Sequence, residues 1–104
     1  MSTGLFQIGN TSMTAGVQQA VLHHGIPPRQ MIEILGRHGS GDWGETSEDD
    51  AKMNDAAVND GSMILSVFTL TGLGDEKLKV WVITDAADDE GVRHQTTVLL
   101  PEEH

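Results

Sequence analysis

The sequence predicts an α+β domain in which N-terminal helices pack on an antiparallel sheet of three or four strands. Three apolar runs rich in β-branched and aromatic residues occupy 63–70, 78–84 and 96–100, with turn-forming residues between them. Earlier in the chain, apolar residues recur at helical spacing instead. At 104 residues we expect one domain, with a mainly helical cover over 1–61 and an antiparallel β-meander over 62–101.

The first half of the chain predicts two helices behind a short extended segment. The alternating run 4–8 predicts an edge strand or an N-terminal arm, and the polar residues 10–12 predict a turn. Helical spacing predicts a helix over 15–24, which Gly25 would end in a left-handed conformation. Two prolines follow, and proline in the first turn favours a second helix over 29–37.

A third, acidic helix is predicted mainly from its end signals. Ser47 can cap the first turn, and the carboxylates at 48–50 suit the positive end of a helix. The helix should end near Asn59, just before Gly61. Its apolar side is thin, and we expect Met53 to belong to it together with two alanines and a valine.

The run 63–70 carries apolar residues on both strand faces, which predicts a central strand of the sheet. A hairpin loop with two glycines at 71–76 and an acidic loop at 85–91 connect the three strands. Pro101 is expected to end the last strand and to leave 102–104 as a frayed tail.

The acidic charge of the chain argues against two function classes and favours a third. Sixteen acidic residues face six basic ones, for a net charge of −10. Phosphate binding needs clustered Lys or Arg, and no segment offers such a cluster. We therefore expect no direct binding to nucleic acid or to an anionic membrane, whereas a basic protein partner suits this charge.

The absence of cysteine excludes a disulfide framework and a thiolate zinc site. No apolar run approaches membrane-spanning length, and the N-terminus lacks a basic segment followed by an apolar stretch. The sequence thus predicts a cytoplasmic protein that needs no cofactor.

Several segments together carry a family resemblance. They include His-x-Ser-Gly-Asp-Trp-Gly at 38–44, Asn54 in the acidic helix, Trp-Val-Ile-Thr at 81–84 and Thr-Thr-Val-Leu-Leu-Pro-Glu-Glu at 96–103. In this order they resemble a family of short bacterial proteins carried on plasmids and integrative elements. The resemblance spans most of the chain and implies a mobile-element origin, but it implies no particular activity and assigns no functional residue.

Residues 36–44 hold four glycines in nine positions and predict a loop in which Trp43 is the one large apolar side chain. His38, Asp42 and a neighbouring serine combine a base, a carboxylate and a hydroxyl, as hydrolytic sites do. Their spacing fits no nucleophile elbow, so we favour loop or capping bonds for Asp42 and a core position for Trp43. The alternative is a pocket lined by His38, Asp42 and Trp43 together with Trp81, although the core is also the favoured place for Trp81.

The histidines do not predict a metal site. His23 and His24 are adjacent and diverge on a helix, so they cannot chelate as an i, i+4 pair. His38 with Asp42 could join one of them, but exposed positions near helix C-termini are the favoured interpretation of such histidines.

The carboxylates cluster at 45–50, 85–90 and 102–103. The plainest interpretation is a solvated surface that keeps a small protein soluble. A sharper one is a decoy surface, because carboxylates on a rigid scaffold can imitate phosphates and occupy a basic groove. The residues expected to carry such binding are Asp49, Asp50, Asp88 and Asp89. Calcium is a third interpretation, but the spacing at 85–90 is not that of an EF-hand.

The favoured function is a non-enzymatic protein-interaction module of a mobile element. It would bind a basic partner, from host defence or DNA-processing machinery, through its acidic face. The alternative is a small-molecule-binding or hydrolytic domain with its pocket at the glycine-rich loop. A homodimer through a sheet face or a strand edge is compatible with either function.

Overall fold

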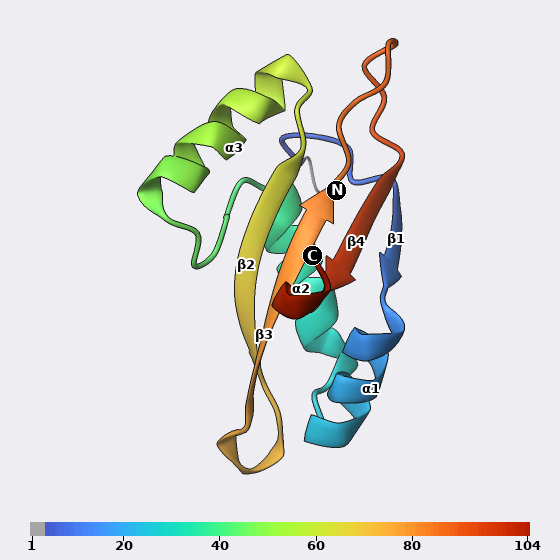
Figure 1. The fold of residues 1–104 in the computed structure, drawn as a ribbon, viewed down its shortest axis with the longest axis vertical. Helices are drawn as coiled ribbons and strands as arrows, with labels where there is room; N and C mark the ends of the chain where they lie inside the picture. Colours follow the sequence, from blue (N-terminus) through green and yellow to red (C-terminus); the bar gives the residue numbers. More distant parts are fainter. Residues whose placement is uncertain (1–3) are drawn as a thin grey trace.

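A four-stranded mixed sheet with the strand order β1-β4-β3-β2 organises the protein (Figure 1). A computed structural model describes residues 4–104. The α+β class predicted from the sequence is confirmed. In chain order the elements are β1 (Asn10–Met13), α1 (Ala15–His24), α2 (Pro28–Gly39), α3 (Glu48–Asp60), β2 (Ile64–Thr71), the 3-10 turn η1 (Leu73–Asp75), β3 (Lys77–Thr84), β4 (Gln95–Leu99) and the 3-10 turn η2 (Pro101–Glu103).

Capping side chains and glycines mark the ends of α1 and α3, as the sequence predicted for Ser47, Gly25 and Gly61. Thr14 accepts a hydrogen bond from the backbone N–H of Val17 at the start of α1, and Ser47 accepts one from Asp50 at the start of α3. Gly25 and Gly61 end these helices with φ of 64° and 84°, the left-handed region that glycine adopts at little cost.

The prediction of a purely antiparallel sheet is wrong, because the first strand runs parallel to the last. Strands β2, β3 and β4 form the expected antiparallel meander, but β1 pairs in parallel with β4, with Asn10 opposite Gln95. The fourth strand is therefore not the alternating run 4–8, which forms an arm, but the polar segment that was expected to be a turn. This strand is largely exposed, so it shows no alternation of apolar and polar residues.

The prediction that the strand at 63–70 is central is also wrong, since β2 lies at an edge of the sheet. Helix α3 lies beside it, and the loop before α3 forms a short parallel bridge between Gly44 and Val67 (Figure 1). Cover from these two segments explains why both faces of β2 are apolar although it is not flanked by two strands.

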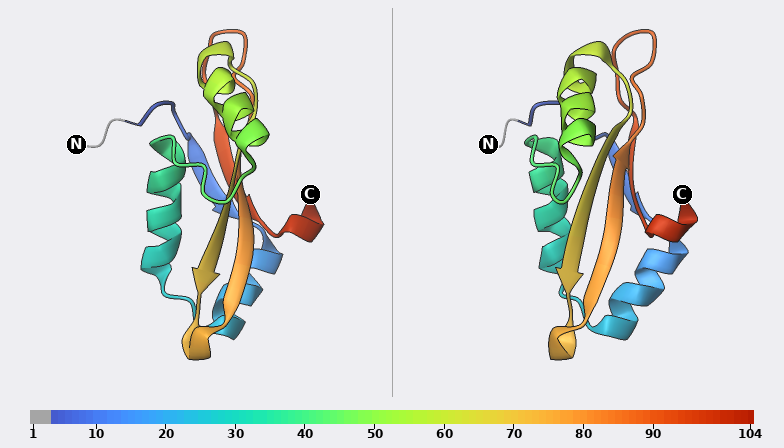
Figure 2. Two further views of the ribbon diagram at one scale, coloured as in Figure 1. Left: turned by 90° about the vertical axis from the view of Figure 1, so that its left-hand side faces the viewer. Right: turned by 60° about the vertical axis from the view of Figure 1, so that its left-hand side comes forward.

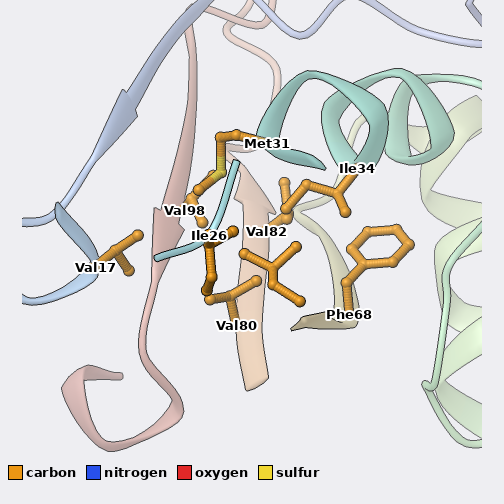
Figure 3. Packing of buried hydrophobic residues seen from close by; sticks show 9 residues of the cluster. Val17, Ile26, Met31, Ile34, Phe68, Val80, Val82 and Val98 are labelled. Carbon is orange, nitrogen blue, oxygen red and sulfur yellow. The ribbon is translucent and has the colours of Figure 1, made fainter. Parts of the chain in front are cut away.

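The main core lies on the face of the sheet that α2 covers, and α1 contributes Val17 to it. Its buried residues interdigitate between the strands and the helices (Figure 3): Val17, Ile26, Met31, Ile34, Phe68, Leu70, Val80, Val82 and Val98. The opposite side of the sheet carries η2 and the C-terminal residue rather than a second layer such as α2 (Figure 2). A smaller cluster of Trp43, Ala57 and Ile64 joins α3 and the glycine-rich loop to the edge strand.

Candidate functional site

His38, the candidate base, is fully buried in the last turn of α2. The predictions of a helix ending at 37 and of a loop beginning at 36 are wrong, because α2 continues to Gly39, and the glycine-rich loop is the remaining segment 40–44. Its Nδ1 atom lies 2.6 Å from Ser66 Oγ, and its Nε2 atom lies 2.8 Å from Thr84 Oγ1. The chain of bonds continues from Thr84 Oγ1 to Thr96 Oγ1 at 2.7 Å. Because both ring nitrogens are engaged away from solvent, His38 cross-links α2 to β2 and β3, and the expectation of an exposed helix-end histidine is wrong for this residue.

The surroundings of His38 keep its ring neutral. Burial, and then the nearby charge of Arg93, lower the pKa of His38 from 6.5 to about 4. Phe6 from the N-terminal arm covers the ring edge-on, with ring centroids 5.3 Å apart. A neutral ring can accept one hydroxyl hydrogen bond and donate another, which suits its two hydroxyl neighbours.

Asp42 and Trp43 have structural roles in the same loop. Asp42 Oδ2 accepts a hydrogen bond from Arg37 Nε at 2.7 Å, and its Oδ1 accepts one from the backbone N–H of Gly44 at 3.0 Å. The bond from Arg37 is the main cause that lowers the pKa of Asp42. The Trp43 ring is buried, and its Nε1 donates to Asp55 Oδ1 of α3 at 3.0 Å.

Trp81 lies apart from these three residues, on the other face of the sheet. It is half-buried and belongs to neither core cluster, so the favoured core position is wrong for Trp81. Its ring centroid lies 5.0 Å from that of His104, so the residues after β4 pack on the sheet and the prediction of a frayed tail is wrong. The structure therefore brings His38 close to Trp43, with centroids 6.0 Å apart, but does not bring Asp42 or Trp81 into a common pocket with them.

The four acidic candidates fall into two groups at opposite ends of α3. Asp49 and Asp50 lie in its first turn, whereas Asp88 and Asp89 lie in the β3–β4 loop, next to Gly61 at the other end. A helix of 13 residues separates the groups by about 18 Å. The single acidic face expected from the sequence is thus two patches.

The two groups differ in how free their carboxylates are. Asp88 Oδ2 lies 2.6 Å from His94 Nε2, and its Oδ1 accepts two backbone N–H bonds, so this side chain holds its own loop together. His94 is the main cause that lowers the pKa of Asp88. Within residues 4–104, no ion pair involves Asp49 or Asp50, which remain exposed. These two carboxylates can therefore meet a partner without breaking existing bonds.

An apolar groove of about 180 Å³ adjoins Asp50, between α3 and the start of β2. The side chains of Met53 and Met63 line it and are 69% and 46% exposed. Half-buried Leu65 and buried Asn54 complete the lining. The volume lies below the roughly 300–1,000 Å³ of small-molecule pockets, so one apolar side chain suits it better than a metabolite.

Asn54 fixes the distance between α3 and the edge strand. Its Nδ2 donates to the carbonyl of Leu65 at 2.6 Å, and its Oδ1 accepts from the N–H of the same residue at 3.1 Å. The amide thereby takes the place of a neighbouring strand at this point of the edge. These two bonds hold the backbone that underlies the groove in place.

Two further hollows lie elsewhere on the described part of the chain. One of about 260 Å³ lies between the N-terminal arm and α2, beside Phe6 and Leu35. The other, of about 320 Å³, lies between the end of α3 and the β3–β4 loop, and it contains Arg93. Arg93 donates to the backbone carbonyls of Ala57, Ser62 and Asp85, so its buried charge serves to hold these segments together. Residues 4–104 contain no group of three or more His, Asp or Glu side chains placed to hold a metal ion.

The sequence interpretation missed the groove because it placed Met53 on the buried side of α3. That prediction is wrong: α3 lies beside the edge of β2 and buries only a narrow stripe, in which Asn54 and Ala57 are the fully buried members. A polar residue in the stripe that should be apolar is the one signal that could have revealed the arrangement, since a buried amide needs partners.

No known protein family, curated protein or solved structure matches this chain. In the part of the chain that the structure describes, none of the helices has both the length and the apolar character needed to cross a membrane.

Proposed function

We propose that this protein is a non-enzymatic interaction module that binds a basic protein through the first half of α3 and the adjoining groove. The observation that carries the proposal is the pair of exposed methionines, Met53 and Met63, beside the carboxylates of Asp49 and Asp50, which form no ion pair within residues 4–104. Methionine is common at adaptable binding surfaces, because its flexible, polarisable side chain fits varied partners. An acidic margin next to an apolar contact favours a partner with the opposite charge.

The charge of the whole chain supports a basic partner rather than a second copy. Each copy carries a net charge of −10, so two copies that met through this surface would repel each other. A basic protein would instead be attracted from a distance and would bind faster at low ionic strength. A homodimer through another surface stays a prediction, as does a partner from host defence or DNA-processing machinery.

Affinity capture with matched charge variants tests the proposal. Partners bound by the wild type should be lost with Asp49→Asn/Asp50→Asn and when salt is raised from about 50 mM to about 500 mM, which shortens the Debye length to a few ångströms. Glu33→Gln/Glu102→Gln is the control, because it removes the same charge from exposed positions elsewhere. Equal capture by the two double variants at both salt concentrations would refute the proposal.

A further inference from the structure

We infer that the groove between α3 and β2 accepts one apolar side chain from a basic helix of the partner. This inference rests on the proposed function and specifies the chemistry of the partner. Three features of the groove carry it: its closed backbone edge, its volume and the spacing of charge along α3.

The edge of β2 beside the groove cannot accept another strand. Asn54 already occupies both the N–H and the C=O of Leu65, and the loop at Trp43 and Glu45 occupies those of Val67. Further along the edge, the side chain of Gln30 occupies both groups of Thr71. Because these backbone groups already have hydrogen-bond partners, a partner strand could not pair with them. Binding by strand addition is therefore excluded, and recognition must use side chains.

The size of the groove limits what can enter it. At about 180 Å³ it is slightly larger than the engineered protein cavities of about 150 Å³ that bind benzene, so a single Leu, Met or Phe side chain fits. The methionine walls are mobile enough to adapt to any of the three.

The charges lie at one helical turn from the groove wall. Asp49 and Asp50 precede Met53 by four and three residues, which places them on neighbouring positions of the helix surface, about 5–6 Å apart. A partner helix repeats the same spacing when Lys or Arg lies three or four residues from its apolar residue. A helix also satisfies its own backbone hydrogen bonds, so it needs nothing from the sealed strand edge.

NMR of the protein with 13C-labelled methionine methyl groups tests the inference directly. The probe is an alanine-rich helical peptide with one leucine at its centre and lysines three and four residues on either side. On titration, the methyl signals of Met53 and Met63 should shift while that of the core residue Met31 stays in place. Replacing the leucine of the peptide by alanine should weaken binding by about tenfold, because the buried methyl groups are lost. Replacing its lysines by glutamates should abolish it.

Variants of the protein separate this inference from the proposed function. Met53→Gln should weaken binding of the peptide about tenfold, whereas Ile32→Gln, an equally exposed apolar position on α2, should leave it unchanged. If Asp49→Asn/Asp50→Asn weakens binding but Met53→Gln and the alanine peptide do not, the groove inference fails and the charge-based function stands. If no methyl signal shifts at about 1 mM peptide, and the charge variants capture the same partners as the wild type, both the groove inference and the proposed function fail.

Discussion

The region around His38 and the region around Met53 contrast in a way that neither residue type suggests. His38 is polar and fully buried, and every polar atom of its ring has a partner. Met53 is apolar and 69% exposed, beside carboxylates that have no cationic partner within residues 4–104. The difference comes from position relative to the sheet: α2 lies across a face, whereas α3 lies beside an edge.

The contrast separates a region that stabilises the fold from one that is available for binding. A buried histidine with two hydroxyl partners contributes to stability only as long as all three groups remain. An exposed methionine contributes little to the folded state, and a large patch of such side chains usually marks a binding surface. We therefore expect substitutions at His38 to affect folding and substitutions at Met53 to affect partners.

The largest expected effect is that of His38→Ala. The change removes a fully buried ring and the hydrogen bonds that the ring makes to the hydroxyls of Ser66 and Thr84. It should therefore lower the free energy of unfolding by about 3–5 kcal/mol. Urea denaturation followed by tryptophan fluorescence measures this. His23→Ala is the control, since His23 is exposed and its loss should cost less than about 0.5 kcal/mol. Similar values for the two variants would show that the buried bonds contribute nothing.

Acidification should destabilise the protein through the same residue. The pKa of His38 falls from 6.5 to about 4 on folding. Between about pH 4 and pH 6.5, His38 is therefore protonated in the unfolded chain but neutral in the folded chain. Stability should therefore be complete above pH 6.5 and should fall by up to about 3 kcal/mol as the pH drops toward 4. Urea midpoints across this range give the slope. His38→Gln should flatten it, and an unchanged slope in that variant would assign the effect to other groups.

Asn54→Ala should lower the free energy of unfolding by a smaller amount. It removes the side chain that occupies the backbone groups of the strand edge beneath the groove. Two hydrogen bonds to Leu65 disappear, at a cost of about 2 kcal/mol. Light scattering should also rise at high protein concentration, because an exposed edge invites pairing with another chain. Asn59→Ala, at an exposed position of the same helix, controls for the lost helix-surface amide and should leave both measurements unchanged.

The smallest effect on stability should come from Met53→Gln. The side chain is mostly exposed, so the free energy of unfolding should change by less than about 0.5 kcal/mol. Thermal denaturation provides the measurement. A decrease in the free energy of unfolding of more than about 2 kcal/mol would mean that Met53 belongs to the core, as His38 does.

The sequence predicted the helices and the meander because their signals are local. Ser47, Gly25 and Gly61 mark helix ends within a few residues of the chain, and the helices end where they indicate. Trp43 was expected in the core, and it is buried there.

The remaining features depend on contacts between distant segments, which spacing cannot reveal. The short polar strand β1 carries no pattern of its own and becomes a strand only because Gln95 and its neighbours lie beside it. The burial of His38 depends on Ser66 and Thr84, far along the chain, and the exposure of Met53 depends on the placement of α3 at an edge. Neither residue type nor helical spacing encodes these positions.

The parallel pairing of β1 with β4 also has a consequence for biosynthesis. Residues 10–13 are made about 85 residues before their partner strand at 95–99, and translation proceeds at about 5–20 residues per second. Until then the first strand has no neighbour to bind, although α1 and α2 can already form. We expect β1 to dock only after the meander has assembled, so a pause in translation before residue 95 would prolong the time that β1 stays unpaired.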